Sequence, residues 1–230
     1  GYSDNTNLIF LLATLTDTAA VYGPNAGAFG MEPWHVSIQD AYELLQGKKF
    51  EMQNYPMWEK ESLKDKEHPL AAYHVTEPFV LHSNKKDGRS FEMEGRLLGG
   101  CLDCLSHLRG TKFDKVNDFN QKYEDDGVLW FLESCDLNVF EMRRTLWSLK
   151  QAGWFDTCRG FLIGRPGLQG QIIAGLDQYE AVLSILNEFE VPVLMDLDIG
   201  HVAPMMPLIC GSYGKVTVAG NNCQIAMSLQ

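Results

Sequence analysis

The chain has 230 residues, of which 45% are hydrophobic and 21% are charged, and its formal net charge at pH 7 is −11. This composition is ordinary for a globular protein with one large core or two modest ones. The acidic balance argues against a nucleic-acid partner, because phosphate binding needs a basic face. No stretch reaches the roughly 18 apolar residues that a membrane helix needs, so no membrane association is expected.

The chain opens on Gly1 rather than Met and enters a motif at once. We interpret it as a piece of a longer protein whose upstream part is absent. Residues 4–16 are strongly apolar and predict a buried helix that begins directly after Ser3. Because Gly and Pro are densest near residues 24–34, we expect a domain boundary there, with one domain ending at residues 1–30 and a second spanning 31–230.

The remaining elements alternate between helices and strands. An amphipathic helix is predicted at 36–46, β-structure broken by a long loop at 50–92, and a Gly-Gly turn with a short apolar helix at 95–110. Buried strands are predicted at 127–133, 161–164 and 191–197, helices at 138–152 and 176–189, and a hairpin around 220–222. This alternation indicates an α/β class.

Three polar residues occupy positions where α/β folds place their active sites. Ser3 immediately precedes an apolar helix, Glu133 ends a buried strand, and His201 follows the strand VPVLMDL through a short turn. Ligands in α/β folds bind where the carboxyl ends of strands meet. A serine hydroxyl needs a base to take its proton, and a carboxylate orients the histidine that does so. The backbone N–H of Asp4, at the helix start, is the candidate donor to a developing oxyanion.

Each of these residues also has an ordinary structural interpretation. Ser3 could be a helix N-cap, Glu133 could be a surface residue at a strand end, and His201 could be a loop histidine bonded to a carbonyl. The order Ser, acid, His matches that of α/β-hydrolases, although the segment GYSD lacks the second glycine of G-x-S-x-G.

Four segments, in the same order along the chain, resemble those of the LD-carboxypeptidase family of serine peptidases, which includes the microcin C immunity peptidases. They are GYSDNTNL, GRLLGGCLDCLSHLRGT, LWFLESCDLNVFEMRRTLWSLKQAGWF and VPVLMDLDIGHVAPMMPLICG. The resemblance assigns the nucleophile to Ser3, the acid to Glu133 and the base to His201. Cys101 stands where the family often has Asn.

The resemblance implies the end of a Rossmann-like nucleophile domain, followed by a β-rich α/β C-terminal domain that supplies the acid and the base. It also implies a homodimer, a second oxyanion donor upstream of this chain, and a small peptide or aminoacyl-nucleotide substrate. The family's substrates are murein L,D-tetrapeptides and aminoacyl-nucleotide antibiotics. The long 50–92 segment favours the microcin-immunity branch. No cofactor and no metal are expected.

Several weaker patterns leave alternatives open. Cys101 and Cys104 form a C-x-x-C, which could bind zinc or be redox-active, but buried thiols are the favoured interpretation, and a reducing compartment such as the bacterial cytoplasm is expected. The histidines at 68, 74 and 82 could bind a metal, yet a solvated loop is favoured. Trp58 and Tyr73 could stack on a planar substrate group or simply fix the loop.

Two functions therefore compete. The first is a serine carboxypeptidase-type hydrolase that cleaves an amide near a free carboxylate through Ser3, Glu133 and His201. The second is a non-catalytic binding or structural fragment that lacks a complete active site.

Overall fold

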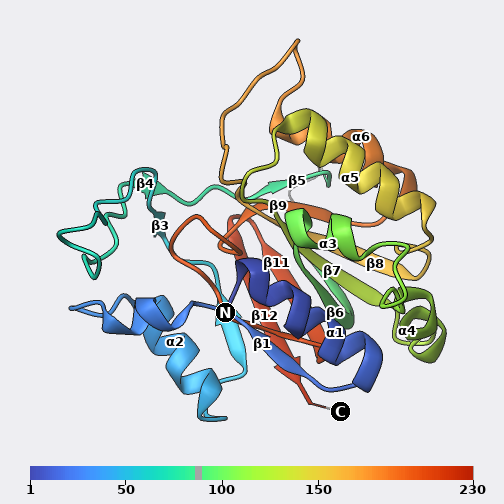
Figure 1. Ribbon diagram of the computed structural model, residues 1–230, viewed down its shortest axis with the longest axis horizontal. Helices are drawn as coiled ribbons and strands as arrows, with labels where there is room; N and C mark the ends of the chain where they lie inside the picture. The colour runs from blue at the N-terminus through green and yellow to red at the C-terminus, as the bar shows by residue number, and fades with distance from the viewer. Residues whose placement is uncertain (86–89, 230) are drawn as a thin grey trace.

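A single eight-stranded mixed sheet organises the computed structural model, which describes residues 1–85 and 90–229 (Figure 1). Its strand order is β2-β12-β11-β6-β7-β8-β9-β5, and two smaller pairs, β1-β10 and β3-β4, lie beside it. The strands are β1 (Ala20–Tyr22), β2 (Glu51–Gln53), β3 (Met57–Trp58), β4 (Glu77–Pro78), β5 (His82–Ser83), β6 (Phe91–Cys101), β7 (Val128–Glu133), β8 (Cys158–Gly164), β9 (Val193–Leu197), β10 (Leu208–Cys210), β11 (Tyr213–Ala219) and β12 (Asn222–Ser228). The helices are α1 (Thr6–Thr16), α2 (Val36–Leu45), α3 (Leu102–Leu108), α4 (Val116–Lys122), α5 (Val139–Gln151) and α6 (Gln178–Leu186), with 3-10 turns η1 (Ser3–Asn5), η2 (Ala26–Gly30) and η3 (Asn187–Phe189).

The centre of the sheet is parallel. Strands β6, β7, β8 and β9 pair in sequence order, and helices α3, α5 and α6 connect them. All six residues of β7 are buried, as expected for a strand covered on both faces. Because these four strands are parallel, their carboxyl ends meet at one edge of the sheet, and this is the edge where Glu133 ends β7.

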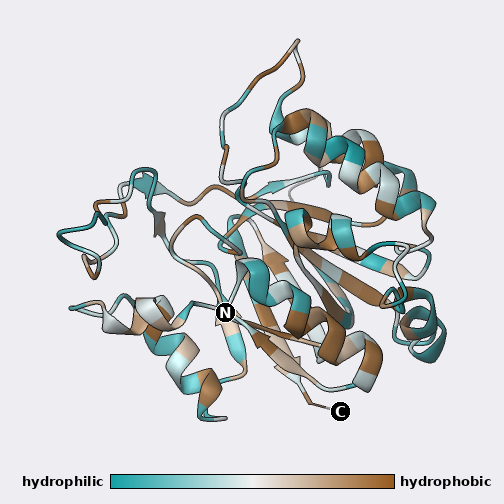
Figure 2. Cartoon of the chain, in the orientation of Figure 1, coloured by the Kyte–Doolittle hydropathy of each residue, from teal (hydrophilic) through white to brown (hydrophobic). Residues whose placement is uncertain are grey.

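The flanks of the sheet are antiparallel. The hairpin β11–β12 continues the sheet beyond β6, and its buried residues alternate with partly exposed ones. This period of two is typical of strands with one solvated face. The hydropathy view shows the same contrast, with apolar residues along the central strands and mixed residues on the helices (Figure 2).

The helices pack in a row, with α1 against α3, α3 against α5 and α5 against α6. A capping box sets the start of α5. The Asn138 side chain accepts the backbone N–H of Glu141, and the Glu141 side chain accepts the backbone N–H of Asn138. Stacked aromatic rings join α1 to the sheet. The ring centroids of Phe10 and Trp154 are 5.3 Å apart, and those of Trp154 and Trp130 in β7 are 5.9 Å apart. Residues 1–30 and the later segments therefore contribute to one hydrophobic core.

The predicted helices, strands and hairpin are confirmed, with two corrections. The Gly-Gly turn expected within 95–110 is wrong, because Gly99 and Gly100 lie inside strand β6. The helix at 4–16 is not buried all round, since Leu8 is 62% exposed. No helix among the described residues is both long and apolar enough to cross a bilayer.

The correction at β6 has a steric cause. A Cβ at Gly99 would overlap the carbonyl oxygen of Phe131 on the neighbouring strand, and a Cβ at Gly100 would lie 2.5 Å from Cγ2 of Thr6. These glycines therefore permit close packing rather than a turn.

We predict that Gly99→Ala lowers the free energy of unfolding by roughly 3 kcal/mol, because the added methyl group must displace the backbone of β7. Gly27→Ala is the matched control, since a Cβ there would meet nothing within 4 Å. Urea unfolding followed by circular dichroism measures both variants. Equal midpoints for the two variants would contradict the steric account.

Candidate active site

Glu133 and His201 form a hydrogen-bonded pair at the carboxyl-end edge of the sheet. The Oε2 atom of Glu133 lies 2.8 Å from Nδ1 of His201. The Glu133 side chain is fully buried, whereas the His201 side chain keeps 16% of its surface exposed. A buried carboxylate that holds a partly accessible imidazole is the arrangement in which histidine serves as a general base.

The turn before His201 is shaped so that the imidazole reaches Glu133. Gly200 has φ +100°, and a Cβ there would lie 2.5 Å from the Glu133 carboxyl carbon, so only glycine fits. Three residues before His201, Asp198 forms a buried ion pair with Arg165 (Oδ1 to Nη1, 2.7 Å) and accepts the Tyr55 backbone N–H at 2.8 Å. These contacts fix the start of the turn.

The Glu133 side chain is held from a second direction. The hydroxyl of Tyr22, at the end of β1, donates to Oε1 of Glu133 at 2.5 Å. With the bond from His201 to Oε2, both oxygens of the Glu133 carboxylate are thus hydrogen-bonded. The loop that follows Glu133 is also held in place, because the Asp103 carboxylate on α3 accepts the backbone N–H groups of Cys135 and Asp136 at 3.0 and 2.9 Å.

Electrostatics favour a proton on His201. Burial lowers the pKa of His201, but the hydrogen bond and charge of Glu133 outweigh it, and the pKa is raised above the ordinary value of 6.5. Burial and then the Glu133 charge raise the pKa of Tyr22 well above 10.0, so its hydroxyl stays protonated and donates.

Ser3 occupies a strained turn directly after Tyr2. Its φ is +64°, a left-handed conformation that non-glycine residues rarely adopt, between the extended Tyr2 and the start of α1. The Tyr2 ring packs edge-on against the His201 ring with 4.7 Å between centroids. Ser3 and Asp4 both lie in the 3-10 turn η1. The structure therefore joins Glu133 and His201 directly and places Ser3 beside a residue that contacts His201.

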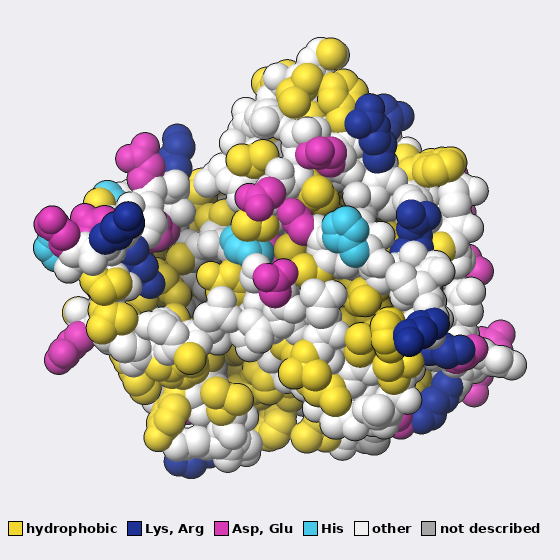
Figure 3. Space-filling view, in the orientation of Figure 1, with side chains coloured by type: hydrophobic (Ala, Val, Ile, Leu, Met, Phe, Trp, Pro, Cys, Tyr) yellow, Lys and Arg dark blue, Asp and Glu magenta, His cyan; other side chains and the backbone are white. Residues whose placement is uncertain are grey.

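The first turn of α1 docks on the same edge of the sheet. The hydroxyl of Thr6 accepts the backbone N–H of Cys101 at 3.1 Å, and Cys101 pairs with Glu133 in the register of β6 and β7. In Figure 3, histidine and acidic side chains gather near the middle of the face, around the region where Figure 1 shows the start of α1 and α3.

A cavity of about 210 Å³ opens next to His201. Its lining includes Tyr2, Glu59, Lys64, Tyr73 and His201. The Lys64 ammonium lies 4.8 Å from the centroid of the Tyr73 ring, so this cavity has an aromatic wall and a positive charge. Tyr73 can therefore face a flat group, while Lys64 and Glu59 place one positive and one negative charge on the lining.

Cys101, Glu133 and His201 also have potential metal-ligand atoms within 4.8 Å of one another. The Glu133 oxygens are already hydrogen-bonded to Tyr22 and His201. Burial raises the pKa of the Cys101 thiol, which disfavours the thiolate that a metal needs. The contacts fit proton transfer better than metal binding.

The structure gives a separate result for each weaker sequence pattern, namely the three histidines, the C-x-x-C and the two aromatic residues. His82 pairs with Asp196 and His68 with Asp65, while the His74 backbone N–H bonds to Glu59, so these three histidines do not form one cluster. All six cysteines are free thiols, including both of the C-x-x-C. Tyr73 lines the cavity beside His201, and Trp58 lines a different one.

Sequence reasoning missed the residues that support the pair. Tyr22 ends strand β1, which is not among the predicted elements, and its partner Glu133 is 111 residues away. Asp103 lies inside the C-x-x-C motif, where the cysteines, and not the aspartate, suggest a zinc or redox site. Nothing local in the sequence marks either contact, since both depend on how the segments pack.

We predict that the His201 pKa, measured by NMR titration, lies above 6.5 and falls in Glu133→Gln, because burial then acts without the neighbouring charge. The protonated form is stabilised in the folded state. This stabilisation is complete below the ordinary pKa and is lost as pH rises through the folded-state pKa, so the variant should also show a weaker fall in stability over that range.

Asp136→Asn is the matched control, because Asp136 acts on His201 through charge alone and is the last of the four contributions that raise the pKa. It should lower the His201 pKa less than Glu133→Gln does. An equal fall in the two variants would show that the direct hydrogen bond is not the dominant contribution.

Comparison with known proteins gives the family. Residues 94–216 match the LD-carboxypeptidase C-terminal domain, which is more than half of the chain. The microcin C7 self-immunity protein MccF of Escherichia coli is 26% identical over 239 residues, and the match covers 100% of this chain and 65% of that protein. The chain thus spans just under two thirds of that relative's length.

Solved structures share the fold. The structure of MccF in complex with glutamyl sulfamoyl guanosine aligns with a TM-score of 0.77 at 20% identity, covering 100% of this chain and 67% of that one. The muramoyltetrapeptide carboxypeptidase from Oxalobacter formigenes aligns with a TM-score of 0.70 at 18% identity, with the same coverage. With residues 94–216 matched, the chain belongs to the LD-carboxypeptidase C-terminal domain family, a family of serine peptidases.

Proposed function

We propose that this chain is part of a serine hydrolase that cleaves an amide bond near a free carboxylate, with Ser3 as nucleophile, His201 as base and Glu133 as the group that orients His201. The observation that carries the proposal is the buried hydrogen bond between Glu133 and His201, 2.8 Å long, together with the contact of the His201 ring with Tyr2, the residue before Ser3. Family membership supports the same chemistry.

The proposed steps follow from the atoms available. Glu133 accepts from Nδ1–H of His201, which leaves Nε2 to take the Ser3 hydroxyl proton as Oγ attacks the carbonyl carbon. His201 then gives that proton to the leaving amine, and water hydrolyses the acyl-enzyme. The strained φ of Ser3 supports the nucleophile role, since α/β-hydrolases expose their serine on a similarly sharp turn.

The developing oxyanion needs N–H donors. We assign one to the backbone N–H of Asp4, which follows the nucleophile at the start of the helical segment. We further propose that residues 1–30 form the end of a nucleophile-bearing domain and residues 31–230 the domain that carries the acid and the base.

For the substrate, we propose an aminoacyl nucleotide of the microcin C type, with a murein L,D-tetrapeptide as the second candidate. The cavity beside His201 supports the first choice, because Tyr73 and Tyr2 offer rings for a planar base and Lys64 offers charge for an anionic group. MccF itself is solved with AMP and with aspartyl sulfamoyl adenosine. The muramoyltetrapeptide carboxypeptidase shares the fold, which keeps the second candidate.

We also propose that the protein acts as a homodimer in the bacterial cytoplasm. The six free thiols support a reducing compartment. A non-catalytic binding or structural fragment is the alternative.

We predict that a fluorophosphonate probe labels Ser3 and that Ser3→Ala lowers kcat/KM by about 10³-fold or more, since the nucleophile is removed. The assay uses two substrates, an aminoacyl-sulfamoyl adenosine and an L,D-tetrapeptide. Each is tested with two protein forms, the 230-residue chain and a longer polypeptide that contains it. Ser83→Ala, in the edge strand β5, is the control and should keep full activity.

Full activity of Ser3→Ala would refute the proposed nucleophile. If neither protein form hydrolyses either substrate, the binding-fragment alternative is supported instead.

A further inference from the structure

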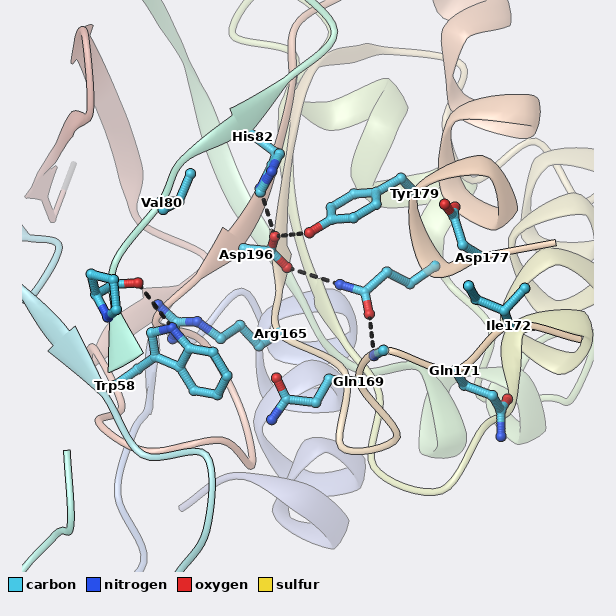
Figure 4. Close-up of a pocket in the computed structure, with 13 residues that line it drawn as sticks. Trp58, Val80, His82, Arg165, Gln169, Gln171, Ile172, Asp177, Tyr179 and Asp196 are labelled. Atoms are coloured by element: carbon cyan, nitrogen blue, oxygen red, sulfur yellow. Dashed lines mark hydrogen bonds and ion pairs between the residues drawn. The ribbon is translucent and has the colours of Figure 1, made fainter. Parts of the chain in front are cut away.

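A second cavity, of about 360 Å³, lies apart from the one beside His201. We call it the Trp58 cavity, and its lining includes Trp58, Val80, His82, Arg165, Gln169 and Ile172 (Figure 4). It shares no lining residue with the cavity beside His201. Its volume falls within the range of small-molecule sites, roughly 300–1,000 Å³.

Arg165 is the most unusual group in this lining. Its side chain is 3% exposed, and Nη1 pairs with Asp198. Its second terminal nitrogen, Nη2, is buried and has no hydrogen-bond partner among the described residues. Because buried donors are nearly always satisfied, this N–H group calls for an acceptor that the described residues do not supply.

An aromatic ring stands next to this donor, and apolar side chains line other parts of the cavity. The Arg165 guanidinium lies 5.1 Å from the centroid of the Trp58 ring, and Trp58 is held in place because Nε1 donates to the Pro78 carbonyl at 3.1 Å. Val80 and Ile172 add apolar side chains that are 51% and 69% exposed. A fixed indole with exposed apolar neighbours suits a flat apolar group.

The opposite wall is polar but already satisfied. Asp196 has φ +62° within β9, and its carboxylate accepts from Tyr179 at 2.6 Å and from Gln178 at 3.2 Å and pairs with His82 at 2.7 Å. Both of its oxygens are engaged, as Figure 4 shows. Asp196 is therefore poorly placed to attract a cationic ligand. Asp177, the other carboxylate of the lining, accepts the backbone N–H of Glu180 at the start of α6. The buried donor of this lining that has no partner among the described residues is Nη2 of Arg165.

We propose that the Trp58 cavity is a binding site for a small carboxylic acid with a flat apolar body. The body packs on Trp58, Val80 and Ile172, and the carboxylate accepts from Nη2 of Arg165 and from the Gln169 amide. The acid can be free or can be the end of a short peptide, because both carry the same group. The site does not depend on the proposed hydrolase activity.

The test is isothermal titration calorimetry on the whole chain with three probes. Phenylacetate represents a free acid, N-acetyl-L-phenylalanine represents a peptide end, and N-acetyl-L-phenylalaninamide is its neutral counterpart. At least one acid should bind, and N-acetyl-L-phenylalanine at least tenfold more tightly than its amide if peptide ends are the ligands. Binding of phenylacetate alone assigns the site to free acids.

Val80→Trp should weaken binding at least tenfold, because the larger ring fills the cavity from an exposed position. Leu63→Trp, also at an exposed apolar residue but outside this cavity, is the matched control and should bind as the unmodified chain does. Ser3→Ala should bind normally, which separates this proposal from the proposed function. No binding of either acid, equal binding of the amide, or unchanged binding by Val80→Trp would overturn the proposal.

Discussion

The buried hydrogen bond between Glu133 and His201 is the constraint around which this end of the molecule is built. A carboxylate with a fully buried side chain is costly unless its oxygens are satisfied, and here Tyr22 and His201 satisfy one oxygen each. The contact between residues 68 positions apart requires Gly200, since any side chain there would collide with Glu133. The strand that ends at Glu133, the glycine in the turn before His201 and the hydrogen bonds to the carboxylate thus all position the Glu133–His201 pair.

Much of the fold could be predicted from local patterns. The run VLWFLE is buried throughout as β7, and α5 lies within the helix predicted at 138–152. The Gly-Gly pair of β6 predicts a turn, which is wrong. Glycine occurs in turns and also where two backbones approach closely, and the sequence of this segment does not distinguish these two cases without the neighbouring strand.

The candidate site was predictable in part, for a similar reason. Glu133 ends a strand and His201 follows one, so their positions indicated an active-site edge, and the family resemblance assigned their roles. Tyr22 and Asp103 support the pair through contacts over long sequence separations, and no local pattern encodes these. The Arg165–Asp198 ion pair was equally hidden, although it links the Trp58 cavity to the turn that carries His201.

The most direct measurement is a crystal structure of the protein that resolves the Ser3 hydroxyl with a substrate analogue bound. The account predicts that Oγ of Ser3 lies within hydrogen-bond reach of Nε2 of His201, about 3 Å, while Nδ1 stays bonded to Glu133. A Ser3 hydroxyl turned away from the imidazole, with the analogue bound elsewhere, would contradict it.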